Sequence, residues 1–196
     1  MKRRNALACV GLLPLLLTGC ASTPTATHWY ELKSAPPEAV PAPGADDGSV
    51  WELSALVRLP GALDRDTLVV ASGAAGVTPL SGHRWVEPLR ASIPARLADD
   101  LARLRGAGRA WLSPAPAGVR VTQRLRVEID TLVADEARTV LRLRARWWLS
   151  EVAPTGSPAS GTAVIDIRLP DPSVDTLAAA HRLAIWRLAR QIEAPP

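Results

Sequence analysis

The stretch Leu125-Arg126-Val127-Glu128-Ile129-Asp130 alternates apolar and charged residues, and this alternation decides the fold. The same pattern returns over residues 139–149 and 163–169, where apolar side chains again occupy every second position. Alternation with period two is typical of a strand that has one buried and one solvated face. Turn-rich segments at residues 135–136 and 154–161 separate the three runs. We therefore expect three successive strands in an antiparallel meander.

The charged face of the middle run carries three arginines, Arg142, Arg144 and Arg146. Two interpretations are open. The arginines pair across strands with acidic neighbours on a solvated face, or they form a surface that docks an acidic partner or phospholipid head groups. The acidic neighbours are Glu128, Asp130 and Asp166. The three arginines are the candidate partner interface.

Two amphipathic segments can cover the apolar face of such a sheet. Residues 85–104 repeat apolar side chains every three or four positions, which predicts a helix with one buried face. Pro94 interrupts this helix, so we expect a kink there or a restart with Ser92 near its cap. Asp99 and Asp100 point about 100° apart on a helix and do not converge, which favours a solvated flank over an acid–base pair.

A second helix is expected after Asp171-Pro172-Ser173, which combines a capping side chain with a first-turn proline. Its apolar stripe is Val174, Leu177, His181, Ile185, Leu188 and Ile192. His181 lies on this stripe without a second ligand at metal spacing, so we expect a packed core histidine. The fold class that follows is α+β, with a mostly antiparallel sheet of about five to six strands covered on one face by two helices.

The N-terminal half supplies the remaining strands. Residues 28–32 are expected to form a short first strand, and residues 34–49 form a loop rich in proline and glycine. Alternation over residues 51–59 predicts a half-buried strand, and residues 68–71 predict a shorter one. Gly73-Ala74-Ala75-Gly76 has the G-x-x-G spacing of some phosphate-binding loops, but a turn between two short strands is the better interpretation.

The chain begins with a basic segment, residues 1–5, followed by a short apolar run, Ala6 to Leu17. A membrane-spanning helix needs about 20 apolar residues, so this shorter run indicates a secretory signal peptide. The run ends in Leu17-Thr18-Gly19-Cys20, which resembles the bacterial lipobox. The resemblance implies that residues 1–19 are removed and that Cys20 carries a diacylglycerol and an N-acyl chain. The alternative is an ordinary signal peptide cut nearby, which leaves a soluble periplasmic protein.

Residues 20–27 are expected to form a lipidated tether, and residues 28–196 a single periplasmic domain. The segment from Ala21 to Thr27 reaches at most about 24 Å when extended, so the domain should stay close to the membrane. The residue after the acylated cysteine is Ala21 rather than aspartate. By resemblance to enterobacterial lipoprotein sorting, this favours the periplasmic face of the outer membrane over the inner membrane.

Charge and cysteine content exclude several classes of function. The net charge of +4 includes Lys2, Arg3 and Arg4 of the signal, and without them 20 basic residues face 19 acidic ones. This near balance gives no case for nucleic-acid binding. Cys9 lies in the signal and Cys20 is the acylation site, so no thiol remains for a disulfide, a metal or a nucleophile. We expect no metal, and no cofactor besides the acyl chains.

A catalytic site is not expected either. No G-x-S-x-G nucleophile motif, P-loop or dinucleotide fingerprint occurs in the sequence. The three histidines, His28, His83 and His181, are predicted in a strand, a loop and a helix stripe, so they do not suggest a triad with a serine and a carboxylate. The sequence predicts a protein without catalytic residues.

Two blocks of sequence resemble one family. Ala55 to Val70 resembles the Leu-Pro, Leu-Asp-Arg and Leu-Val signature of the ABC-type transport auxiliary lipoproteins, the PqiC-like family. Gly82 to Leu89 resembles the family's Arg-Trp-x-Glu-Pro-Leu entry into its first helix. The motif residues are Leu63, Asp64, Arg65, Trp85, Glu87, Pro88 and Leu89. These residue types suit scaffold roles: Asp64 can bond backbone amides, Arg65 can pair with a carboxylate, and Trp85 can fix the loop to the helix.

The resemblance implies a function in lipid movement between membranes. It implies an outer-membrane-anchored accessory of an MCE-type intermembrane lipid transport system, which docks the periplasm-spanning MCE-domain subunit and supports envelope integrity without catalysis. Homo-oligomerisation stays open. The alternative from another class is a lipoprotein that chaperones or plugs an outer-membrane barrel, and a lipid-modifying hydrolase is a third, less favoured interpretation.

Overall fold

The structure is a computed structural model that describes residues 26–43, 47–153 and 158–194. The expected signal peptide, Cys20 and most of the tether lie outside these ranges. Among the described residues, no helix has the length and apolar character needed to cross a membrane. The elements follow in the order β1 (His28–Tyr30), β2 (Trp51–Leu53), β3 (Thr67–Ser72), β4 (Gly76–Trp85), α1 (Leu89–Arg105), β5 (Ala110–Leu112), β6 (Gln123–Ala134), β7 (Val140–Glu151), β8 (Ala159–Arg168) and α2 (Val174–Glu193).

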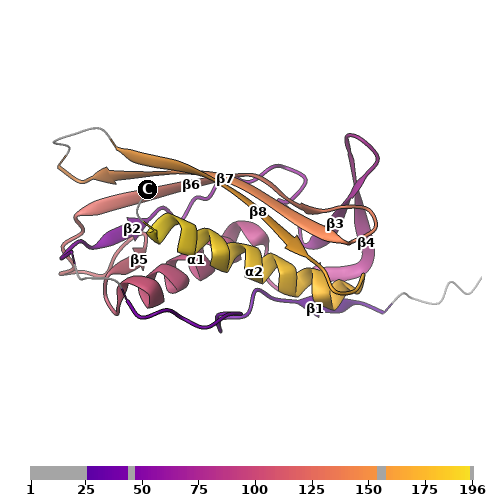
Figure 1. The fold of residues 1–196 in the computed structure, drawn as a ribbon, viewed down its shortest axis with the longest axis horizontal. Helices are drawn as coiled ribbons and strands as arrows, with labels where there is room; N and C mark the ends of the chain where they lie inside the picture. Colours follow the sequence, from indigo (N-terminus) through magenta and orange to yellow (C-terminus); the bar gives the residue numbers. More distant parts are fainter. Residues whose placement is uncertain (1–25, 44–46, 154–157, 195–196) are drawn as a thin grey trace, which may run out of the picture.

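One mixed sheet contains all the strands, and both helices lie on the same face of it (Figure 1). The expected meander is confirmed, because β6, β7 and β8 pair antiparallel in sequence order. The other edge of β6 pairs in parallel with β2 at one end and with β3 at the other, where Val70 lies opposite Ala134. The fold class is therefore α+β with two covering helices, as expected.

The sheet differs from the expectation in being mixed rather than mostly antiparallel, and in having eight strands over the described residues. The parallel pairs β2–β5 and β2–β6 follow from α1, which lies between these strands in the sequence and returns the chain to the same end of the sheet. Three strands, β1, β2 and β5, have only three residues each. Strands were expected where β1 and β2 lie, although β2 ends at Leu53 rather than at residue 59, and the two strands that were not expected are β4 and β5.

A β-bulge at Asp130 shifts the alternation along β6. The pairing with β7 steps from Ile129 to Thr131, so that Asp130 has no opposite residue. Leu132 therefore returns to the buried face one position out of phase with Val127 and Ile129. The bulge allows β6 to pair with two different strands, β2 and β3, along the edge that faces away from β7.

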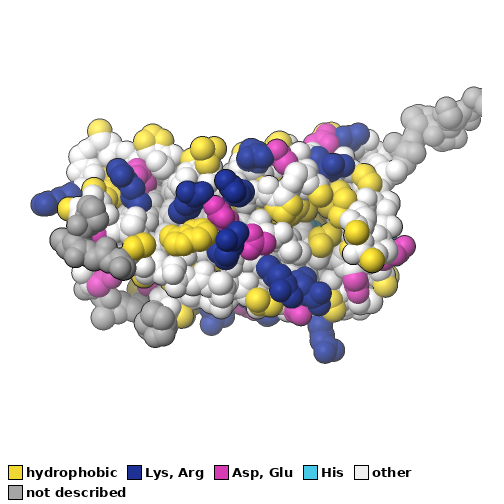
Figure 2. All heavy atoms as spheres, turned by 90° about the horizontal axis from the view of Figure 1, so that it is seen from above, with side chains coloured by type: hydrophobic (Ala, Val, Ile, Leu, Met, Phe, Trp, Pro, Cys, Tyr) yellow, Lys and Arg dark blue, Asp and Glu magenta, His cyan; other side chains and the backbone are white. Residues whose placement is uncertain are grey.

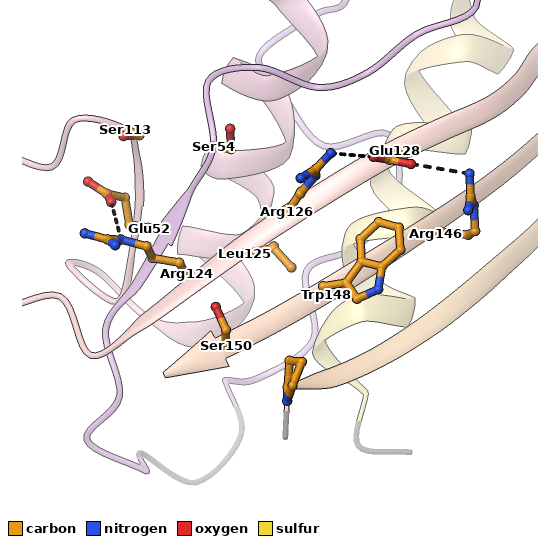
Figure 3. A pocket seen from close by; sticks show the side chains of 11 residues that line it. Glu52, Ser54, Ser113, Arg124, Leu125, Arg126, Glu128, Arg146, Trp148 and Ser150 are labelled. Atoms are coloured by element: carbon orange, nitrogen blue, oxygen red, sulfur yellow. Dashed lines mark hydrogen bonds and ion pairs between the residues drawn. The ribbon is translucent and has the colours of Figure 1, made fainter. Parts of the chain in front are cut away.

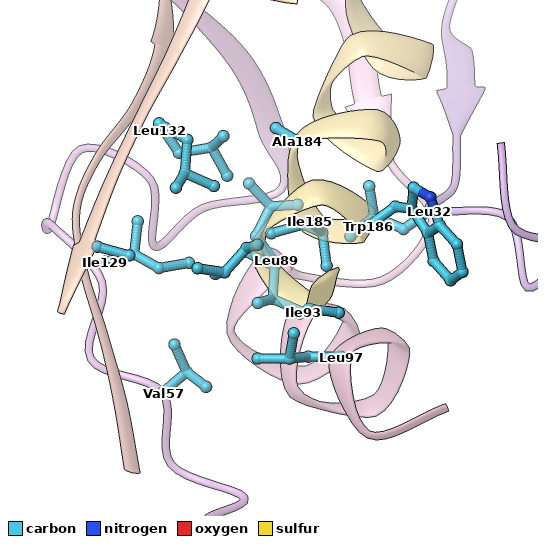
Figure 4. Packing of buried hydrophobic residues seen from close by; sticks show 14 of the residues in the cluster. Leu32, Val57, Leu89, Ile93, Leu97, Ile129, Leu132, Ala184, Ile185 and Trp186 are labelled. Carbon is cyan, nitrogen blue, oxygen red and sulfur yellow. The ribbon is translucent and has the colours of Figure 1, made fainter. Parts of the chain in front are cut away.

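The core fills the space between β6, β7, β8 and the two helices. Figure 4 shows Ile129 and Leu132 of the sheet directed toward Leu89 and Ile93 of α1 and Ile185 of α2. Each of these five side chains is almost fully buried. Burial of one such side chain contributes about 1.5–3 kcal/mol, so this layer is a large part of what stabilises the fold.

Helix α1 begins four residues later than expected and continues through Pro94 without a break. Its first turn is closed by the Ala91 and Ser92 amides, which donate to the Pro88 carbonyl, so Ser92 lies inside the helix rather than at a restart. Pro94 lies on the buried face of the helix. Packing against the core there outweighs the hydrogen bond that proline cannot donate.

The expectation of a solvated flank at Asp99 and Asp100 is wrong for Asp100. Asp100 is fully buried and accepts two hydrogen bonds from Arg182 of α2, both 2.7 Å long. Asp99 is partly exposed and pairs with Arg96 one turn earlier. The pattern of α1 alone did not show that α2 packs along this flank and brings a cation to it.

Helix α2 has the predicted cap and the predicted core histidine. The Ser173 side chain accepts from the Thr176 amide at 3.1 Å, and Asp171 accepts from the Ser173 amide at 2.8 Å. His181 is buried, and its Nδ1–H donates to the Leu177 carbonyl at 2.8 Å. Its ring meets Trp85 edge-on at a centroid distance of 5.2 Å. Burial lowers the pKa of His181 to about 4, so the ring is neutral at physiological pH.

Candidate partner-binding surface

The face of the sheet opposite the helices is rich in arginine. Arg142, Arg144 and Arg146 all point out from β7 on this face and are exposed. Figure 2 views this side of the molecule and shows basic, acidic and hydrophobic side chains interleaved over the sheet. We call this surface the outer sheet face. Arg124 and Arg126 of β6 extend it toward β2.

Glu128 of β6 lies at the centre of the outer sheet face and is surrounded by guanidinium groups. Arg126 donates to one carboxylate oxygen at 2.7 Å, and Arg146 of β7 lies 3.3 Å from the other. Arg58, from the segment before β3, approaches to 3.8 Å. The Glu128 side chain is only 9% exposed, whereas the arginine side chains are about half to three-quarters exposed, so water still screens their guanidinium groups. The arrangement orients the arginines around one buried carboxylate.

Arg146 and Arg142 also pair with acidic residues across the strands. Arg146 binds both oxygens of Asp130, with nitrogen–oxygen distances of 3.0 and 2.9 Å. Asp130 raises the pKa of Arg146 above its already high ordinary value. Arg142 donates to Asp166 of β8 at 3.0 Å. The expected cross-strand pairing therefore holds for these two arginines, because antiparallel neighbours bring their side chains together.

Arg144 differs from its two neighbours. Within the described ranges, no hydrogen bond or ion pair is assigned to its side chain. Its partner residue on β8 is Val164, which is itself 61% exposed, and its partner on β6 is Thr131. The bulge at Asp130 directs that carboxylate to Arg146. Arg144 thus presents an uncompensated cation beside an apolar side chain.

A groove of about 760 Å³ runs along the outer sheet face at the end formed by β2 and β5 (Figure 3). Trp148 forms part of its floor, and the Arg146 guanidinium lies 5.7 Å from the Trp148 ring centroid. At the β2 end, Glu52 accepts from the Ala115 amide at 2.9 Å and lies 3.5 Å from Arg124. The groove combines guanidinium groups, one aromatic ring and carboxylates that are already engaged. Such a surface suits an acidic or mixed polar partner.

The expected interface was therefore only part of this surface. Arg126 and Trp148 alternate in phase with the predicted arginines, so the strand pattern could have included them. Glu52 and Arg58 could not have been found in this way. Glu52 reaches the groove through the parallel pairing of β2, and Arg58 approaches Glu128 beside the groove through an isolated bridge between the two residues. Local sequence does not encode either contact.

The Leu-Asp-Arg motif forms a turn before β3. Leu63 is buried in the core, whereas Asp64 bonds the Arg90 side chain, with one contact of 2.8 Å to Nε, rather than the expected backbone amides. Arg90 holds the pKa of Asp64 below its usual range. Arg65 is exposed, and in the described part of the chain it has no assigned carboxylate partner. The expected partner of Asp64 was wrong because α1 supplies a cation that the turn alone does not show.

The second motif connects β4 to α1. Trp85 and Leu89 are buried at its two ends, and Trp85 packs on His181 of α2. Pro88 occupies the N-cap position, where its carbonyl receives the first helical amides. Glu87 is exposed. These contacts fix the loop against both helices and leave the motif far from the groove.

Two histidines lie together although the sequence did not predict it. His83 lies in β4 rather than in a loop, and its ring stacks on His28 of β1 at a centroid distance of 5.2 Å. The Tyr30 hydroxyl lies 2.9 Å from His83 Nδ1. Burial and the charges of His28 and Arg138 lower the pKa of His83. Over residues 26–43, 47–153 and 158–194, no cluster of three or more His, Cys, Asp or Glu residues is arranged to hold a metal ion.

Comparison with known protein families shows the family of this chain. Residues 30–193 match the model of the family described as the ABC-type transport auxiliary lipoprotein component. The chain belongs to this family. The description of the family gives its members an auxiliary role in transport. The comparison with curated proteins found no match.

Two solved structures share the fold of this auxiliary lipoprotein. One is a crystal structure of an uncharacterized protein, 14% identical, which superimposes with a TM-score of 0.67 over 86% of this chain and 97% of the other. The second is a DUF330 protein from Xanthomonas campestris, 12% identical, with a TM-score of 0.66 over 85% of this chain and 93% of the other. At these identities the likeness establishes the common fold alone.

Proposed function

We propose that this auxiliary lipoprotein is anchored in the outer membrane and docks the periplasm-spanning MCE-domain subunit of an intermembrane lipid transport system through its outer sheet face. The family supports a role beside a transporter. The lipobox at Cys20 and the residue after it, Ala21, support the anchor and its membrane. The protein contributes position and affinity to this system, and no turnover chemistry of its own.

The observation that carries the proposal is the Arg144 cation on a preorganised arginine surface. Arg126 and Arg146 are held by the buried carboxylate of Glu128, so a partner has less side-chain freedom to immobilise. Arg144 remains available to an acidic group. Arginine and tryptophan are the residues most enriched at the energetic centres of interfaces, and Trp148 supplies the second type beside them.

The anchor turns a modest surface into an effective docking site. One acyl chain holds a protein to a bilayer only marginally, but several chains make the attachment effectively permanent. A protein confined to one membrane meets a partner that reaches that membrane at a high effective concentration. The affinity of the outer sheet face can therefore be moderate while the complex persists.

The proposal is tested by purifying the tagged, full-length lipoprotein after cross-linking in cells. We expect to recover an MCE-domain protein, and to recover less of it with the Cys20→Ala variant because the high local concentration is lost. Arg144→Glu should reduce recovery by at least about tenfold, since it places a carboxylate against an acidic partner. It breaks no assigned internal contact, so the fold should be unaffected.

The matched control is Arg187→Glu on α2. Arg187 is also a surface arginine, but it lies on the helical side of the molecule, away from the outer sheet face. It pairs with Glu38 at 2.8 Å. Its reversal should leave recovery of the MCE-domain protein unchanged. Recovery of a barrel protein instead would favour the chaperone or plug alternative, and equal loss with both variants would contradict docking through the outer sheet face.

A further inference from the structure

An exposed apolar patch lies at the opposite end of the molecule from the groove. Trp29 is 59% exposed and Val86 is 60% exposed, and both line a second hollow of about 550 Å³ together with Pro36 and Pro37. All seven tryptophans of the chain fall in the described ranges, and Trp29 is the most exposed of them. We call Trp29, Val86, Pro36 and Pro37 the β1 patch. Its exposure is unexplained by packing within the chain.

The β1 patch lies where the chain leaves its anchor. Trp29 is nine residues beyond Cys20, so it can lie no farther than about 32 Å along the chain from the acylated cysteine. In Figure 1, β1 lies at one end of the long axis, whereas β2 and β5 lie at the other. Strand β6 runs from Gln123 near β2 to Ala134 beside β3, and its length is about 40 Å. The patch is therefore near the anchor and the groove is far from it.

The chemistry of the β1 patch matches the boundary between lipid head groups and acyl chains. Tryptophan is enriched at that boundary because its ring is apolar while its indole N–H still needs a polar partner. In the described part of the chain, no hydrogen-bond acceptor is assigned to the Trp29 indole. The neighbouring backbone is firmly held, because the Val86 amide donates to the Tyr30 carbonyl at 2.7 Å. Glu31, Lys33, Asp175 and Arg182 line the same hollow, so the β1 patch is an apolar surface with charged side chains beside it.

We propose that the β1 patch inserts into the interfacial region of the membrane that holds the Cys20 anchor, with Trp29 at its centre. This proposal rests on the lipid anchor in the proposed function. Insertion at this end fixes the orientation of the domain on the bilayer. The groove near β2 and Trp148 then points away from the membrane, toward a subunit that crosses the periplasm.

Tryptophan quenching tests the proposal on the intact lipoprotein. The protein is reconstituted into vesicles of phosphatidylethanolamine and phosphatidylglycerol with brominated acyl chains, which quench indole emission at short range. We expect part of the emission to be quenched, and Trp29→Leu to lose most of that quenched component. Trp148→Leu is the matched control, because Trp148 lies in the distant groove, and it should leave the quenched component unchanged.

Flotation of the vesicles separates failure of the patch from failure of the anchor. In one outcome, the protein floats with the vesicles while the Trp29→Leu variant is quenched as strongly as the unmodified protein. This result overturns membrane insertion of the β1 patch and leaves the docking proposal standing. A quenched component that disappears with Trp148→Leu instead overturns the proposed orientation. Protein that does not float at all contradicts the lipid anchor, on which both proposals rest. Since Trp29 is exposed, its replacement should leave the circular dichroism spectrum unchanged.

Discussion

Arg182 of α2 and Asp100 of α1 form a two-fold hydrogen-bonded ion pair inside the protein, and both nitrogen–oxygen distances are 2.7 Å. The same arginine donates from Nε to the Lys33 carbonyl at 2.6 Å. One side chain therefore connects both helices to the segment that follows β1. Burial raises the pKa of Asp100, while the Arg182 charge opposes that shift and favours the ionised carboxylate. Because both charges are buried, removing either side chain would leave the other charge buried without its partner.

Replacing one member of the pair should destabilise the protein strongly. Arg182→Met leaves the Asp100 carboxylate buried with only Arg103 nearby, at 3.6 Å. Loss of one partner from a buried pair costs about 3–5 kcal/mol. Urea unfolding followed by tryptophan fluorescence measures this free energy. The double variant Arg182→Met, Asp100→Leu should be more stable than either single variant, and a single-variant loss below about 1 kcal/mol would contradict the account.

Acidification should weaken the fold through His181. Its pKa is about 4 in the folded protein and about 6.5 when unfolded, so the unfolded chain binds the extra proton first. The contribution of His181 to stability is therefore constant above pH 6.5 and falls as the pH decreases toward 4, by about 3 kcal/mol in total. His181→Gln should flatten this dependence in urea unfolding between pH 6.5 and 4. An unchanged slope in His181→Gln, with the slope lost in His83→Gln, would place the effect at the β1–β4 edge instead.

Gly161 of β8 should not tolerate a larger residue. A Cβ atom at this position would lie 2.6 Å from the Trp147 ring on the neighbouring strand. Trp147 is buried against the core and has little room to move, so Gly161→Ala should cost about 1–3 kcal/mol of folding free energy. Gly61→Ala is the control, since a Cβ there meets no atom within 4 Å. Thermal unfolding of the two variants should differ clearly, and equal melting temperatures would be evidence against this packing.

The three strands of the meander and both helices could be predicted from sequence because their patterns are local, whereas the ten-residue strand β4 was missed. Alternation gave the meander, and the three-to-four spacing gave the helices with their buried faces. The bulge at Asp130 and the three-residue strand β5 were not predicted, because pairing with distant segments creates them. Asp100 was misjudged for the same reason, since its partner lies 82 residues away.

Part of the candidate surface could be predicted, because its arginines follow a local pattern along one strand. Arg142, Arg144 and Arg146 lie on one face of a strand, so their common exposure follows from period two. That Arg144 alone lacks an acidic neighbour depends on the bulge, which turns Asp130 toward Arg146. The contributions of Glu52 and Arg58 depend on parallel pairing across the sheet. Function itself could be inferred only through family membership, because a docking surface has no motif as specific as a catalytic one.

Site-specific photocrosslinking in cells tests the central claim most directly. A photoreactive phenylalanine analogue at Trp148 reports on the groove, and the same analogue at Arg187 reports on the helical side. Docking through the outer sheet face predicts an adduct with an MCE-domain subunit from position 148 and none from position 187. An adduct from position 187 alone, or no MCE-domain adduct from either position, would contradict it.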